Sequence, residues 1–148
     1  MARFHASFRA LPAIPQGGAV FDIRTSSTDY ALLLSLELTT IGASGSAISL
    51  GIGTPASIGV AKPSGIVLLA EDASKPPNVS VGIDWTTPPT SPAKFLRRMS
   101  IVGSSNTTTR YVFPEGLKIA PGSSMVLWAI TAVSAAMVQF LANVEIDG

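Results

Sequence analysis

The chain has 148 residues, of which 47% are hydrophobic and only 13% are charged, and its net charge is +1. This length fits one domain whose core is large enough to be stable without disulfides or structural metals. The lack of cysteine excludes disulfides, zinc–cysteine sites and thiol nucleophiles. Basic residues are concentrated only at positions 94–98, and these few do not form the extended basic surface that neutralises phosphates. We therefore expect no nucleic-acid partner. So little surface charge favours association with copies of the chain or with another protein.

Residues 1–17 are predicted to be an extended arm in front of a β domain that occupies residues 18–148. The stretch is interrupted by basic residues and by Pro12 and Pro15, so it lacks the apolar run of a secretory signal. Four apolar side chains are spaced along it as candidate anchors on partner subunits: Phe4, Phe8, Leu11 and Ile14. We therefore expect the arm to bind neighbouring molecules.

Period-two alternation predicts the first strands, over residues 19–26, 30–40 and 48–53. The second of them is a long central strand, in spite of its leucine content, with one apolar face: Tyr30, Leu32, Leu34, Leu36 and Leu38. In the third, Gly51 and Gly53 share a face, which indicates a close backbone approach or a bend. They do not form a phosphate loop, because neither a lysine nor a helix signal follows.

Residues 54–78 form a long proline-containing connection, and we expect it to be a packed loop or a contact element. It holds a short apolar run at residues 66–69. Ile66 and Leu68 are our candidate partner contacts within this run.

Further strands are predicted over residues 79–85, 95–102, 107–113 and 117–120. Residues 125–142 carry no charge and are about as long as a membrane-spanning helix. However, Val138, Phe140, Ala142, Val144 and Ile146 alternate with mostly polar residues, which is the pattern of a strand. We therefore predict a final hairpin of strands 125–131 and 137–147 with its turn at residues 132–135, and no membrane partner.

Together these patterns predict an all-β, antiparallel two-sheet sandwich of about eight strands. A jelly roll is a common architecture for that number of strands, so we favour it. An immunoglobulin-like sandwich is the alternative, although the cysteine and tryptophan spacing of true immunoglobulin domains is missing.

The supply of catalytic side chains is thin. His5 is the single histidine, no Gly-x-Ser-x-Gly elbow is present, and Glu71-Asp72 is the single adjacent acidic pair, whose carboxylates could bind calcium. Trp85 and Trp128 could form a sugar-stacking platform, but their alternation places both in the core. We expect no enzymatic activity, no cofactor and no metal.

Two segments carry a resemblance to a known class. Residues 111–128, YVFPEGLKIAPGSSMVLW, and residues 87–98, TPPTSPAKFLRR, resemble small β-sandwich structural proteins of tailed bacteriophages. The resemblance in composition extends over most of the chain, which is charge-poor, cysteine-free and rich in Ser, Thr and Gly. It implies a virion component, such as a capsid decoration (cement) protein or a tail or fibre module, and carries over no functional residue.

We therefore expect a virion protein, made in the host cytoplasm, that forms a homo-oligomer, in our interpretation a trimer, and binds the major capsid protein on the head surface or another virion protein. The alternative is a tail, baseplate or fibre module, or a carbohydrate- or receptor-binding β-sandwich.

Overall fold

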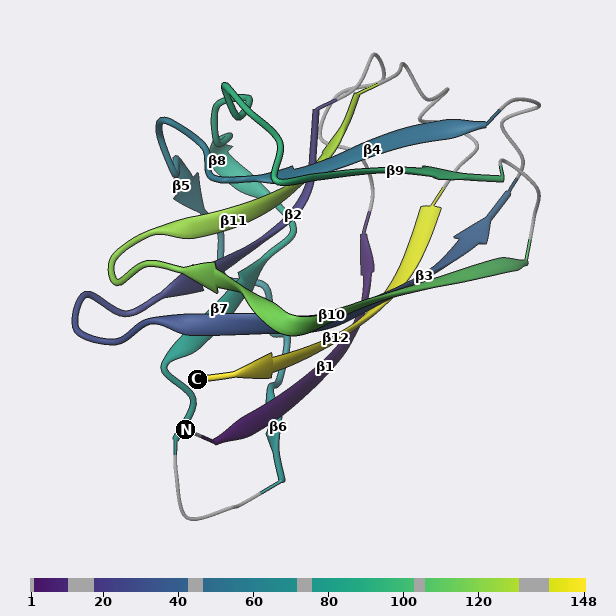
Figure 1. Ribbon diagram of the computed structural model, residues 1–148. Helices are drawn as coiled ribbons and strands as arrows, with labels where there is room; N and C mark the ends of the chain where they lie inside the picture. Colours follow the sequence, from purple (N-terminus) through teal and green to yellow (C-terminus); the bar gives the residue numbers. More distant parts are fainter. Residues whose placement is uncertain (1, 11–17, 43–46, 72–75, 103–105, 131–138) are drawn as a thin grey trace.

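The computed structural model describes residues 2–10, 18–42, 47–71, 76–102, 106–130 and 139–148, and these build two packed five-stranded sheets (Figure 1). All strand pairs are antiparallel. Sheet A has the order β10 (Thr107–Ile119), β3 (Ala31–Ile41), β12 (Gln139–Asp147), β1 (Arg3–Ala10) and β6 (Leu69–Ala70). Sheet B has the order β7 (Val79–Gly82), β2 (Gly18–Thr25), β11 (Ser124–Ala129), β4 (Ile48–Gly53) and β9 (Arg97–Ile101). A small sheet C joins β5 (Val60–Ala61) to β8 (Trp85–Thr87).

The order of the strands is that of a jelly roll, as predicted. The four strands β10-β3-β12-β1 face the four strands β2-β11-β4-β9, and the chain changes sheet at nearly every connection between these eight. The exception is the connection from β4 to β9, which are neighbours in sheet B. The remaining strands, β5 to β8, are short additions to this frame of two Greek keys.

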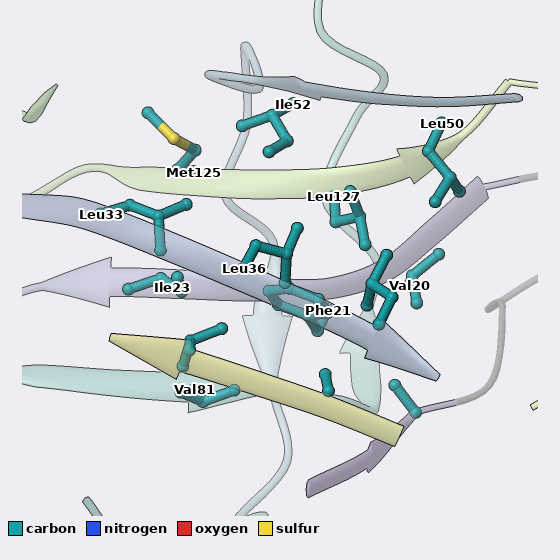
Figure 2. Packing of buried hydrophobic residues seen from close by; sticks show 14 of the residues in the cluster. Val20, Phe21, Ile23, Leu33, Leu36, Leu50, Ile52, Val81, Met125 and Leu127 are labelled. Carbon is teal, nitrogen blue, oxygen red and sulfur yellow. The ribbon is translucent and has the colours of Figure 1, made fainter. Parts of the chain in front are cut away.

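The core fills the space between the two sheets (Figure 2). Alternate residues of each strand point inward, as period-two patterning requires. Phe8 of β1 and Phe21 of β2 join the layers edge to face, with ring centroids 5.0 Å apart and an angle of 81° between the rings. Such contacts between the two inner faces hold the sandwich together.

The prediction of a separate N-terminal arm is wrong for residues 3–10. They form β1, which pairs along its whole length with β12 and lies between β12 and β6 in sheet A. Phe4 and Phe8, predicted to be anchors on other subunits, are buried in the protein's own core together with Ala6 and Ala10. The physical reason is the alternation of these apolar residues with polar ones. Leu11 and Ile14 lie outside the described residues.

The prediction of a final hairpin is also wrong, although both of the predicted strands are present. β11 pairs with β2 and β4 in sheet B, whereas β12 pairs with β1 and β3 in sheet A. The predicted turn at residues 132–135 lies outside the described residues. Alternation locates a strand but does not name its partner, and in a jelly roll the last two strands belong to opposite sheets.

A β-bulge in β3 changes which leucines face the core. Ser35 and Leu33 are both paired with the neighbouring strands, but Leu34 between them is not. The extra residue reverses the phase of the alternation. As a result Leu33 is buried while Leu32 and Leu34 are half-buried, so the single leucine face predicted for this strand is correct only from Leu36 onward.

Two predicted strand boundaries differ from the structure. Residues 107–113 and 117–120 belong to one strand, β10, whose register against β3 shifts between Val112 and Leu117. Residues 79–85 are divided between β7 and β8, which lie in different sheets. The close approach predicted at Gly51 is confirmed, because the ring of Phe95 lies directly over its backbone.

Candidate functional site

The connection between β4 and β7 spans residues 54–78, and its first part, residues 54–71, here called the insertion, begins on the outer face of sheet B. There its strand β5 pairs with β8, and a small cluster of Ala19, Trp85 and Val126 is buried beneath. Arg24 reaches from β2 and donates hydrogen bonds to the carbonyl oxygens of Ile58, at 2.5 Å, and Gly59, at 3.3 Å. The first half of the insertion is therefore fastened to sheet B.

The second half of the insertion runs to sheet A. Ser64 Oγ donates a hydrogen bond of 2.9 Å to the carbonyl of Val81 on the edge strand β7. Further on, β6 pairs with β1, and the Glu71 amide donates to the carbonyl of Arg3 at 3.0 Å. The insertion thus contacts edge strand β7 of sheet B and adds edge strand β6 to sheet A, so it ties the two sheets together.

The two candidate contacts in the insertion face the protein's own core. Ile66 and Leu68 are half-buried and pack against the main core cluster. Their neighbours Val67 and Leu69 point outward and are 68% and 67% exposed. Sequence reasoning missed this outward pair, because a four-residue apolar run does not show which of its two faces is covered.

Exposed apolar side chains gather on the insertion. Of the nine large hydrophobic residues that are exposed in the described chain, four belong to it: Ile58, Val60, Val67 and Leu69. Because the segment is anchored to both sheets, these side chains are presented on a supported backbone. They lie on two stretches, one beside β8 and one beside β1, and each stretch is a candidate contact element.

Beneath the insertion lies a buried carboxylate. Asp22 is fully buried, and its Oδ2 accepts a hydrogen bond of 2.8 Å from Arg24 Nε. Burial, which penalises the charged form, raises the pKa of Asp22, and the nearby Arg24 only partly opposes this rise. Asp22 Oδ1 and the buried Nε1 of Trp85 have no hydrogen bond of ordinary geometry, although the indole lies close enough to lower the carboxyl pKa slightly. This network fixes the insertion, and its Asp22 carboxylate is closed to solvent.

The outer face of sheet A is the polar side of the molecule. It carries eight of the 19 charged residues of the chain and the single histidine: Arg3, His5, Arg9, Glu37, Glu71, Arg110, Lys118, Glu145 and Asp147. Several of them are paired, since Arg3 binds Asp147 at 2.9 Å and His5 Nε2 lies 2.8 Å from Glu71 Oε1. This face is chemically distinct from the apolar insertion.

The sequence raised two kinds of binding for individual residues: sugar stacking on the tryptophans and calcium binding by Glu71 and Asp72. Trp85 is buried, as predicted, and therefore offers no sugar-stacking platform, while Trp128 is half-buried against the same small cluster. Glu71 bonds His5, and Asp72 lies outside the described residues. Across the described ranges, no three His, Cys, Asp or Glu side chains are grouped so that they could hold a metal ion. Nor does this part of the chain contain a helix with the length and hydropathy to span a membrane.

In comparisons with known proteins, no family model, no curated protein and no solved structure matches the chain. Its function therefore has to be inferred from the surfaces described above.

Proposed function

We propose that the chain is a non-enzymatic structural protein of a bacteriophage particle, which decorates the head by binding the major capsid protein as a homotrimer. Three features support this proposal: the single jelly roll, the low charge of the chain and the resemblance of residues 87–98 and 111–128 to phage structural proteins. The resemblance supplies the virion context, and the fold supplies a rigid scaffold for protein contacts.

The observation that carries the proposal is the set of outward apolar side chains on the insertion. Val60, Val67 and Leu69 are each more than half exposed, on a segment fastened to both sheets. Burying apolar surface stabilises an interface by roughly 25 cal/mol per Å² before the costs of association. The insertion thus replaces the N-terminal arm as the proposed attachment element, because Phe4 and Phe8 are committed to the core.

The test is co-sedimentation of the purified chain with heads assembled from the major capsid protein of the same phage genome. The wild type is expected to sediment with the heads, and light scattering of the free protein is expected to give the mass of three chains. Substituting Val60→Asp and Val67→Asp together places two charges in the contact, which should reduce head binding at least about tenfold.

A matched control is the double substitution Val102→Asp and Val112→Asp, whose side chains are 58% and 60% exposed elsewhere on the surface. It should leave head binding unchanged. Absence of the wild-type protein from the head pellet would refute the decoration role, and equal loss in both double variants would refute the assignment to the insertion.

A further inference from the structure

The segment that leads into edge strand β9 concentrates positive charge at the surface of the protein. Lys94, Arg97 and Arg98 are exposed, and Leu96 between them is 49% exposed. We call residues 94–98 the basic segment. Arg97 Nη1 donates a hydrogen bond of 2.8 Å to the carbonyl of Leu96, but none of the three cations forms an ion pair with a described residue. On the outer face of sheet A, by contrast, cations and carboxylates are interspersed and partly paired.

The basic segment is fixed to sheet B by its backbone and by one aromatic ring. The amide of Leu96 donates a hydrogen bond of 2.8 Å to the carbonyl of Ile52 in β4. The ring of Phe95 covers the backbone of Gly51, and the guanidinium of Arg98 lies over this ring, 5.3 Å from its centroid. A segment fixed in this way loses little conformational freedom when a partner binds, which lowers the cost of association.

The acidic side chains that the structure describes leave the basic segment positive. Glu115 and Arg97 line the same depression of about 290 Å³, but they form no ion pair. Four other carboxylates lie on the outer face of sheet A, Asp22 is buried, Asp84 is paired with a lysine, and Asp29 lies between β2 and β3. The segment therefore attracts negative charge from outside the chain.

The combination of cations with an exposed leucine indicates the class of partner. Arginine and apolar anchors are characteristic of protein interfaces, where carboxylates of the partner can pair with the cations while apolar side chains are buried between them. Nucleic acids are held mainly by phosphate contacts to many cations, which three residues do not supply. An acidic protein surface is therefore the better complement.

We propose that the basic segment is a second contact surface of the chain, which docks an acidic segment of a partner protein. Carboxylates of the partner bind Lys94, Arg97 and Arg98, and an apolar side chain among them packs on Leu96. On a phage head this partner is the major capsid protein, and that identification alone rests on the proposed function.

The basic segment and the insertion are positioned to meet the same partner. Leu50 and Ile52 of β4 face the core, so Phe95, which covers Gly51 between them, lies on the outer face of sheet B. The insertion begins on the same face, so a single partner can contact both.

The first test measures binding of a fluorescent, glutamate-rich peptide that carries one leucine to the full chain by anisotropy. A peptide with glutamine in place of every glutamate is its control. The acidic peptide is expected to bind and the glutamine peptide is not. Binding should weaken at least about tenfold between about 0.1 and 1 M salt, where the screening length falls from about 10 Å to about 3 Å.

Variants of the basic segment test the assignment of the site. The triple substitution Lys94→Gln, Arg97→Gln and Arg98→Gln should abolish binding of the acidic peptide. Leu96→Asn should weaken it about fivefold, because the apolar contact is lost.

A matched control neutralises three exposed cations of sheet A, with Arg9→Gln, Arg110→Gln and Lys118→Gln. Both triple variants lower the net charge equally, so only the position of the lost charges distinguishes them, and the control should bind the peptide like the wild type. Four results overturn the proposal: no binding of the acidic peptide, equal loss in both triple variants, unchanged binding by Leu96→Asn, or tighter binding of a single-stranded oligonucleotide than of the peptide.

Co-sedimentation with heads separates this inference from the proposed function. Heads that bind the wild type should bind the triple variant of the basic segment at least about tenfold more weakly and the sheet A control equally well. Undiminished head binding by the triple variant overturns the docking of the capsid protein on the basic segment and leaves the decoration role intact. Heads that do not bind the wild type refute the decoration role, whereas binding of the acidic peptide and its loss in the triple variant still support the basic segment as a contact surface.

Discussion

Arg24 Nε donates a hydrogen bond of 2.8 Å to Asp22 Oδ2, two residues away on the same face of β2. The same guanidinium binds the carbonyls of Ile58 and Gly59, so one side chain joins a buried carboxylate to the backbone of the insertion. A buried charge is tolerated when it is paired and hydrogen-bonded. The position of the insertion, and with it the proposed contact surface, therefore depends on this pair.

Asp22→Ala is expected to destabilise the protein by about 3 kcal/mol, because it leaves Arg24 largely buried without its counterion. The measurement is urea unfolding at neutral pH. Lys62→Ala is the control, since Lys62 pairs with Asp84 at 3.1 Å but both side chains are more than half exposed. An exposed pair of this kind contributes about 0.5 kcal/mol. Equal effects of the two substitutions would show that burial of the Asp22–Arg24 pair has no energetic consequence.

The raised pKa of Asp22 predicts a pH dependence of stability. Above the ordinary aspartate value of 3.8, the folded protein retains this proton more strongly than the unfolded chain. Hence its contribution is fully present below pH 3.8, and the free energy of unfolding falls as the pH rises through the raised pKa. Urea unfolding of the wild type and of Asp22→Asn across this pH range isolates the effect, because all other groups are shared. The difference, wild type minus variant, should decline with rising pH, and a flat or rising difference would contradict the assignment.

Gly51 and Phe95 are predicted to be energetically coupled. A Cβ atom at position 51 would lie 2.7 Å from Cγ of the Phe95 ring, which is closer than real Cβ contacts. Gly51→Ala should therefore cost about 2 kcal/mol by overpacking. In the Phe95→Ala background the same substitution should cost less than about 0.5 kcal/mol, so a double-mutant cycle of urea unfolding measures the coupling. Additive effects would show that the ring does not determine the need for glycine.

The sequence predicted the strands better than their partners. Alternation of apolar and polar residues located most of the jelly-roll strands, because each is covered on one face by the opposite sheet. It could not show that β11 and β12 lie in different sheets, since pairing depends on contacts far apart in the chain. It also missed the bulge at Leu34, because leucines occupy Leu32, Leu34 and Leu36 alike and give no polar signal where the phase reverses.

The grouping of polar residues on the outer face of sheet A was beyond the reach of sequence reasoning for a related reason. Ser35, Arg110 and Asn143 are far apart in the chain, and only the strand order brings them together. None of them belongs to a motif with a fixed spacing. By contrast, the insertion was recognisable from its length and prolines, and only the choice between its inward and outward residues required the structure.

Phe4 provides the sharpest distinction between an arm and a core strand. Its side chain is fully buried between the sheets, so Phe4→Ala is expected to destabilise the protein by about 3 to 5 kcal/mol, from lost burial and the cavity left behind. Val112→Ala, at a side chain that is 60% exposed, is the control and should change the free energy of unfolding by no more than about 0.5 kcal/mol. Urea unfolding of both variants is the measurement. An arm that only touches other subunits would give a Phe4→Ala protein as stable as the wild type, and that result would remove β1 from the jelly roll. Because a small domain has only about 5 to 15 kcal/mol of stability in total, the two outcomes are well separated.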